Sequence, residues 1–205
     1  MRAGHRLIPA VLSVALFGAG HARAEDCAVS SPAKPVVTLD VPPVVYDTSL
    51  NRAAIKKHEI AINRRPHSEV DIILGTTETE IQPSATLQIQ AQPDGTGGFC
   101  ATVASAKTVI SWKMVVHVAS ELKPGSCMYN VVMTHEQGHV DIARGLMGMA
   151  KQLIGGALAS VARKSATAAT PQEASKKLEQ AGSAAFNAAM TKINAEMERR
   201  QAAHD

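Results

Sequence analysis

The sequence predicts an α+β protein in which a small, mostly antiparallel β-sheet packs beside a C-terminal antiparallel helical hairpin. Between residues 69 and 119, apolar and polar side chains alternate with a period of two, as they do in half-buried strands. After KPGSC at 123–127, apolar residues recur at helical spacing almost to the end of the chain. An interruption before TPQE at 170–173 divides this region into two helices, which we expect to fold back on each other.

The first 24 residues have the features of an export signal. Arg2 and Arg6 provide a positive start, an apolar run follows from Leu7 to Ala19, and Ala22-Arg23-Ala24 supplies the small residues of a cleavage site. Cleavage after Ala24 predicts a periplasmic or secreted mature protein. A lipid anchor on Cys27 is the less favoured alternative, because the residues before it are not the small apolar ones that lipidation requires.

Charge gives no indication of a nucleic-acid or membrane partner. The full chain carries 21 basic and 18 acidic residues, but three arginines lie within the predicted signal, so the mature chain is near neutral. No later segment is long and apolar enough for stable membrane insertion. The chain beyond the signal has the length of one domain, which we place at residues 46–205.

The strands are expected to follow a leader and a short helix. Residues 25–45 contain four prolines among valines, which predicts an extended leader with an edge strand at most. Apolar positions at helical spacing predict a helix from Ser49 to about Asn63. Strands are expected at EVDIILGT (69–76), at ATLQIQA (85–91) and, most clearly, at 107–119.

The C-terminal helices are expected at about 129–163 and 171–203. The first carries an apolar stripe along one face. Thr170, Pro171 and Glu173 define the start of the second, as the N-cap, the first helical residue and the far member of a capping box.

The sequence MTHEQGHVD at 133–141 places His135 and His139 one helical turn apart, with Glu136 beside the first. Both imidazoles can therefore reach one ion, while the glutamate reaches a water bound to it. Zinc held in this way lowers the pKa of its water, and the glutamate takes the proton as the water attacks a carbonyl. The alternative is a pair of core histidines bonded to backbone carbonyls, which leaves two buried imidazoles with donors and acceptors to satisfy.

The segment GSCMYNVVMTHEQGHVDIARG resembles the active-site region of exported bacterial HExxH proteins, especially the family called domain of unknown function 922, described as zinc-dependent proteases. The likeness extends over about 35 residues, from the strand at 107 to Ala143. It implies a zincin-like domain with one zinc ion (Zn2+), His135 and His139 as ligands and Glu136 as the catalytic residue.

A catalytic zinc takes three protein ligands plus water, so a third ligand is needed. The metzincin extension is absent, because Ile142 and Gly145 stand where its glycine and histidine would be. In a hairpin centred near residue 167, the level of the motif corresponds to the C-terminal end of the second helix. Glu196 is the first candidate there and His204 the second. The alternative for each is a solvated residue on a terminal helix.

Other residues are candidates for supporting roles. His117 and Tyr129 are candidates for stabilising an oxyanion, and Asp141 for orienting a metal-bound imidazole from outside the coordination sphere. The alternatives are an exposed strand histidine for His117 and packing under a disulfide for Tyr129. His58 and His67 are expected to face solvent.

Three cysteines remain after the predicted cleavage, in a compartment that favours disulfides. We predict a bond between Cys100 and Cys127, which bracket a single strand, whereas Cys27 lies in the proline-rich leader. Three free thiols are the alternative.

Together these features predict an exported zinc-dependent metallopeptidase, with a peptide or protein substrate that pairs as a strand with residues 107–119. The alternative is a non-catalytic metal-dependent or helical binding module of the periplasm. The two differ at the metal, because an enzyme keeps an open coordination position and a structural site is closed by four ligands.

Overall fold

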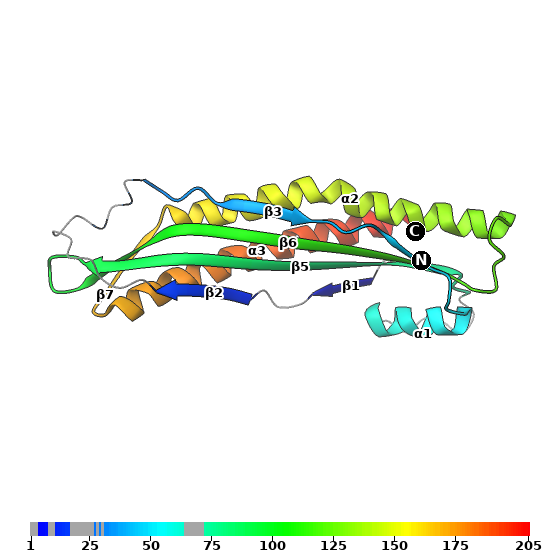
Figure 1. Cartoon of the computed structure of the whole chain (residues 1–205), viewed down its shortest axis with the longest axis horizontal. Coiled ribbons are helices and arrows are strands. Elements are labelled where there is room, and N and C mark those ends of the chain that lie inside the picture. Colours follow the sequence, from blue (N-terminus) through cyan, green and yellow to red (C-terminus); the bar gives the residue numbers. More distant parts are fainter. Residues whose placement is uncertain (1–3, 8–10, 17–26, 28, 30, 64–71) are drawn as a thin grey trace.

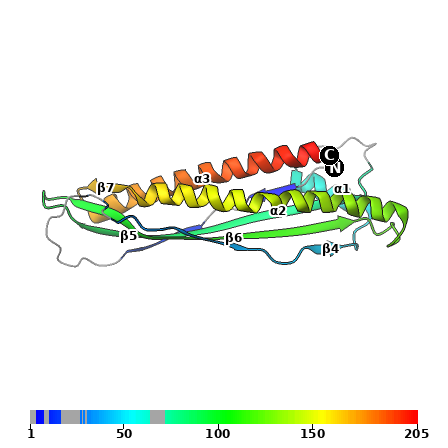
Figure 2. The same cartoon turned by 90° about the horizontal axis from the view of Figure 1, so that it is seen from above.

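The computed structural model describes residues 4–7, 11–16, 27, 29, 31–63 and 72–205. Its centre is a long β-hairpin formed by β5 (Gly75–Pro93) and β6 (Phe99–Val118). Two long helices, α2 (Cys127–Ala162) and α3 (Pro171–His204), run along this hairpin and give the molecule an elongated shape (Figure 1). Seen from above, the helices form one layer and the sheet forms the other (Figure 2).

Antiparallel pairing holds β5 and β6 together along almost their whole length, from Gly75 opposite Val118 to Pro93 opposite Phe99, with an irregularity after Gln88. Side chains alternate between the two faces of a strand. The core-facing set of β6 includes Trp112, which is fully buried. The alternation of apolar and polar residues in the sequence therefore reflects a hairpin of which one face packs on the helices.

Short strands flank the hairpin on both sides and complete a seven-stranded sheet. β1 (Gly4–Leu7) and β2 (Val11–Leu16) pair with β5, and β3 (Val36–Asp40) and β4 (Val45–Asp47) pair with β6, all four in parallel. β7 (Ser165–Ala168) pairs antiparallel with β6. Counted together with the β5–β6 pair, four of the six pairings are parallel, so the prediction of a mostly antiparallel sheet is wrong.

The error has a physical origin in the N-terminal region. Alternation identifies a strand, but it says nothing about the strand with which it pairs. β3 and β4 lie in or next to the proline-rich leader, and Pro42 and Pro43 fall between them, where no ladder hydrogen bond is lost. They pair with β6 along Lys107–Ser111 and Val115–His117. β6 is therefore an interior strand, and the predicted strand pairing of a substrate with 107–119 is wrong.

The predicted export signal is described in part. Residues 4–7 and 11–16 form β1 and β2, whereas the predicted cleavage site at 22–24 lies outside the described residues. Within the described chain, no helix combines the length and apolar character needed to cross a bilayer.

The two long helices begin at well-formed caps. Ser126 is the N-cap of α2 and its side chain accepts a hydrogen bond from the backbone N–H of Tyr129. Thr170 caps α3 in the same way through Glu173, with Pro171 in the first turn. α2 continues through its glycines without a break.

Aliphatic side chains fill the space between the helices and the hairpin. The largest fully buried members of this core include Leu87, Ile110, Leu146, Ile154 and Ile193. α3 approaches the sheet closely at Gly182, where an added Cβ would lie 2.6 Å from Cδ1 of Leu87.

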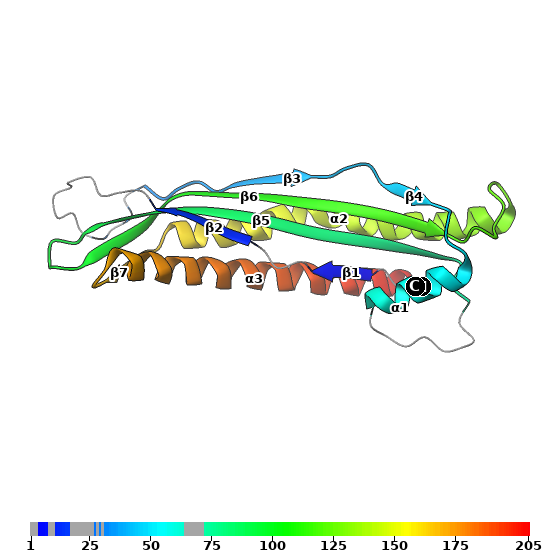
Figure 3. The same cartoon turned by 60° about the horizontal axis from the view of Figure 1, so that its bottom comes forward.

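A short helix, α1 (Arg52–Asn63), lies at the end of the molecule that also holds the C-terminus of α3 (Figure 3). It packs through a small separate cluster formed by Ile55, Ile73 and Ala119. His67 and residues 69–71 of the predicted strand 69–76 lie outside the described residues.

The disulfide joins Cys27 to Cys100, so the predicted Cys100–Cys127 bond is wrong, and Cys127 is a free, exposed thiol. The reason is the length of β6. Cys100 is near its start and Cys127 follows its end, so 18 extended residues place the two cysteines roughly 60 Å apart at 3.3 Å per residue.

Candidate metal centre

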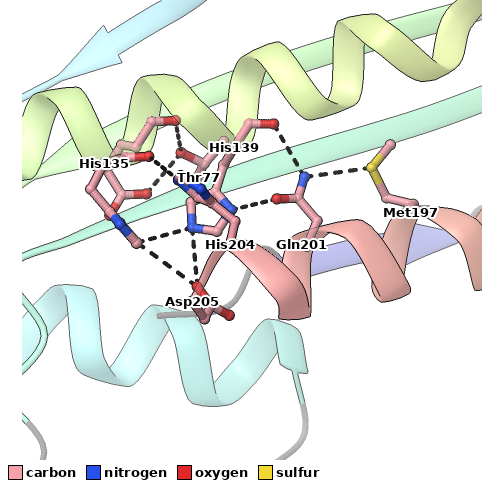
Figure 4. A network of polar contacts seen from close by, with 8 residues as sticks. Thr77, His135, His139, Met197, Gln201, His204 and Asp205 are labelled. Carbon is pink, nitrogen blue, oxygen red and sulfur yellow. Dashed lines mark hydrogen bonds and ion pairs between the residues drawn. The ribbon is translucent and has the colours of Figure 1, made fainter.

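The histidines of the HEQGH motif lie on α2, and the last turn of α3 lies beside them (Figure 4). Because the two helices are antiparallel, residues about 65 positions apart in sequence meet at one level. α3 contributes Gln201 and His204 there, followed by Asp205 at its end. The site is thus formed by two helices that the core holds side by side.

His135 and His139 direct their Nε2 atoms at each other, 3.2 Å apart. Two nitrogens that bind one tetrahedral zinc at about 2.0–2.1 Å are separated by roughly 3.3 Å. The observed spacing therefore fits two ligands of one ion. His139 is 1% exposed and the side chain of His135 is 28% exposed, so one side of the pair reaches solvent.

Gln201 fixes the orientation of the His139 ring. Its amide nitrogen donates to the backbone carbonyl of His139 at 3.2 Å, so its amide oxygen is turned to accept from Nδ1–H of the same residue. Gln201 is almost fully buried. With the proton held on Nδ1, the lone pair of Nε2 is available to a metal, as in the outer hydrogen bonds of known zinc sites.

His204 is the third imidazole. All three rings offer nitrogen atoms that lie within 4.8 Å of one another. The ring of His204 stacks on that of His135 with centroids 4.8 Å apart, and its Nε2 is 3.0 Å from the backbone carbonyl of His135. A proton on Nε2 donates to that carbonyl and leaves Nδ1 for an ion.

Gly138 makes the approach of His204 possible. A Cβ at this position would overlap the imidazole ring of His204, which occupies the space beside the helix backbone. A glycine between the two motif histidines therefore admits the third imidazole.

Asp205 adds a carboxylate to the cluster. Its Oδ1 lies 3.2 Å from Nε2 of His139 and 3.8 Å from Nε2 of His135. The cluster thus consists of three imidazoles, with one carboxylate close to two of them, and both kinds of group are zinc ligands in proteins.

Glu136 is buried behind the histidines. Its Oε2 accepts a hydrogen bond from Oγ1 of Thr77 on β5 at 2.9 Å, while its Oε1 has no hydrogen-bond partner among the described residues. Gly75 provides room for this carboxylate, since a Cβ there would lie 2.8 Å from Oε1. A buried acceptor without a partner is a group that a water or a substrate proton can satisfy.

Burial raises the pKa of the Glu136 carboxyl from 4.5 to about 7, against the opposing effects of the Thr77 hydrogen bond and of His139, and with a further contribution from Glu59. Burial lowers the pKa of His139, but its hydrogen bonds to Asp205 and Gln201 outweigh burial and raise it above 6.5. Burial and the neighbouring His139 lower the pKa of His135.

Glu196, the first candidate for the third ligand, does not join the cluster. Its carboxylate accepts from Arg199 and Arg200 at 2.8 and 2.7 Å, and these bonds lower its pKa to about 2. The expected level was wrong because residues 163–170 are not a tight turn. β7 carries the chain onward before α3 begins, so the level of the motif falls later on α3, where Gln201 contacts His139 and His204 contacts His135.

The predicted supporting residues lie elsewhere. Asp141 accepts from Gln137 at 3.0 Å, and with Tyr129 and Tyr46 it lines a groove of about 560 Å³ that extends to Gly138 of the motif. His117, the oxyanion candidate, is 7% exposed, so the alternative of an exposed strand histidine is wrong; it belongs to a separate cluster with His58, which is partly buried rather than facing solvent.

Sequence reasoning missed Thr77, Gln201 and Asp205. Gln201 had a detectable signal, because it follows Ile193 and Met197 at intervals of four in the buried stripe of α3, where a polar residue needs a partner. Thr77 had none, since its role depends on how β5 packs against α2. No protein-family model, curated protein or solved structure matches the chain.

Proposed function

We propose that this protein is a zinc-dependent metallopeptidase in which His135, His139 and His204 hold the metal. The observation that carries the proposal is the outer hydrogen bonding of the imidazoles. His139 is tied to Gln201 through Nδ1 and His204 to a backbone carbonyl through Nε2, and ligand nitrogens of the three rings lie within 4.8 Å of one another.

Glu136 is the general base of this proposal. Bound zinc polarises a substrate carbonyl and acidifies water. Glu136 accepts a proton from the attacking water on Oε1, which has no partner among the described residues, and passes it to the leaving amine. The hydroxyl of Thr77 holds Oε2 and so fixes the direction of the carboxylate.

Substrate binding is proposed at the edge of β5 that removal of the predicted signal would expose. Within the described chain, the outer edge of β5 pairs with β1 and β2, which belong to the predicted signal. Removal of residues 1–24 on export would leave that edge open from Glu78 to Ile89, beginning next to Thr77. An extended peptide can add to such an edge as a strand. Mature protein is expected to cleave unfolded protein faster than the same chain with residues 1–24 retained.

The position of Asp205 favours a second candidate function, a non-catalytic zinc site closed by four protein ligands. Its carboxylate lies as close to His139 as His135 does. Substitution Asp205→Asn separates the two. An enzyme keeps its zinc and its turnover, because three imidazoles suffice, whereas a closed structural site loses zinc affinity and shows no turnover in either form.

The test compares zinc content and hydrolysis in matched variants. Glu136→Gln is expected to keep the zinc of the wild type and to lose turnover of an unfolded protein substrate by a factor of about 100 or more. His139→Ala is expected to lose one zinc equivalent and all turnover. Glu198→Gln, an exposed glutamate of α3, is the control and should match the wild type. Equal turnover in Glu136→Gln and Glu198→Gln would overturn the catalytic role.

A further inference from the structure

A second cluster of metal-ligating side chains lies outside the proposed catalytic centre. His58 of α1, Glu78 of β5 and His117 of β6 offer ligand atoms that all lie within 4.8 Å of one another. The side chains are largely shielded from solvent, with exposed fractions of 29%, 17% and 9%. Three separate elements therefore bring two imidazoles and one carboxylate to one point.

This cluster faces away from the catalytic centre. In the antiparallel register Thr76 lies opposite His117, and Glu78 lies opposite Val115. Paired residues and those two positions apart share a face, so Glu78 and His117 lie on one face of the sheet and Thr77 on the other. Since Thr77 contacts Glu136, the two clusters lie on opposite faces of the same stretch of β5.

The spacing fits a metal. Nε2 of His58 lies 3.2 Å from Oε2 of Glu78, which is close to the ligand separation of about 3.3 Å in a tetrahedral zinc site. The ring of His58 meets that of His117 edge to face with centroids 5.0 Å apart.

Asp47 of β4 orients His117 from behind. Its Oδ2 lies 3.1 Å from Nδ1 of His117, and its Oδ1 accepts from the backbone N–H of Ser49 at 2.9 Å. A carboxylate on one ring nitrogen holds the proton there and leaves Nε2 as the ligand. This carboxylate–histidine arrangement is the outer hydrogen bonding found around zinc.

We propose that His58, Glu78 and His117 bind a second divalent transition-metal ion, such as Zn2+, with Asp47 as the residue that positions His117. The ion would join α1 to the central hairpin. The apolar contacts of α1 are few, with Ile55 as its fully buried member, so a metal bridge would add substantially to its attachment. The site is independent of the catalytic proposal, since it shares no ligand with it.

The experiment measures zinc per chain by mass spectrometry of elements, after the full-length protein is loaded with zinc and dialysed against metal-free buffer. Wild type is expected to hold two zinc ions, and Glu78→Gln and His117→Ala one. Glu80→Gln is the matched control, because Glu80 lies two residues along β5 on the same face and pairs with Gln82 and Lys113 instead. It should hold two.

Crystals of the wild type should also show two anomalous zinc peaks, one between α1 and β6 and one between α2 and α3. Glu78→Gln is nearly isosteric, so it tests the site even where His117→Ala does not fold. The proposal is overturned when Glu78→Gln retains as much zinc as Glu80→Gln. Loss of zinc in His139→Ala alone would support the catalytic centre and reject this second site.

Discussion

At the scale of single residues, the candidate centre depends on side chains in which one polar atom makes a hydrogen bond to another part of the protein. Gln201 accepts from His139, a backbone carbonyl accepts from His204, and Thr77 donates to Glu136. These bonds select one tautomer and one direction for each group. The HEQGH pattern predicts the first two histidines and the glutamate, but the residues that orient them come from distant positions in the chain.

Substitution Gly138→Ala is expected to displace His204, because the new Cβ would overlap its ring. Zinc affinity at this centre should fall roughly 10- to 100-fold, the range seen when a ligand loses its support. Gly148→Ala is the control on the same helix, since its Cβ would meet nothing within 4 Å. It should leave zinc affinity unchanged and stabilise the fold by up to about 1 kcal/mol. Competition with a chromophoric chelator measures both affinities.

The stability of metal-stripped protein is expected to fall as pH rises from about 4.5 to above 7. Burial raises the folded pKa of Glu136 to about 7, against 4.5 for an unfolded glutamate, so the folded state retains a proton that the unfolded state loses. The free energy of unfolding is expected to fall by an amount on the order of 3 kcal/mol, since each unit of pKa difference corresponds to about 1.4 kcal/mol. Urea unfolding at several pH values measures it. A wild-type pH dependence as shallow as that of Glu136→Gln would contradict this assignment.

At the scale of elements, local signals predict where the helices begin and end but not how elements pair. The cap at Thr170 is predicted from the sequence and α3 begins beside it, whereas the structure identifies Ser126 as the cap of α2. The level at which α3 meets α2 depends on β7, four residues with no marked pattern of their own. This is why Glu196, the first candidate for the third ligand, lies away from the site and His204, the second candidate, lies at it.

Substitution Gly182→Ala tests the close packing of α3 on β5. The added methyl group would lie 2.6 Å from Cδ1 of Leu87, which is fully buried, so the two side chains would have to shift apart. We expect a loss of about 1–3 kcal/mol in the free energy of unfolding, despite the better helix propensity of alanine. Gly156→Ala in α2 meets nothing within 4 Å and should stabilise the protein instead. Thermal or urea unfolding of the two variants gives the comparison.

At the scale of the whole molecule, the long hairpin separates parts of the chain that are close in sequence and joins parts that are distant. Cys100 and Cys127 lie at opposite ends of β6, whereas Cys27 lies beside Cys100. The same geometry places the C-terminus of α3 beside α1, so that both clusters of histidines lie toward one end of the molecule (Figure 3).

Substitution Cys27→Ser is expected to destabilise the oxidised protein by about 4 kcal/mol, because the bond closes a loop with a sequence separation of 73 residues. Cys127→Ser removes a free, exposed thiol and should leave stability unchanged. Unfolding in urea without reductant measures both. Equal stability of Cys27→Ser and wild type, or a loss in Cys127→Ser, would contradict the observed pairing.

The sequence by itself determined the helical motif, the two long helices with the cap of the second and the alternation of the central strands, since each depends on residues within a few positions of one another. Tertiary structure alone decided the parallel pairing of the short strands, the Cys27–Cys100 bond and the choice of His204 over Glu196 as the neighbour of His135 and His139. These depend on the straight length of β6 and on the distance that β7 carries the chain, and neither is encoded in any local pattern.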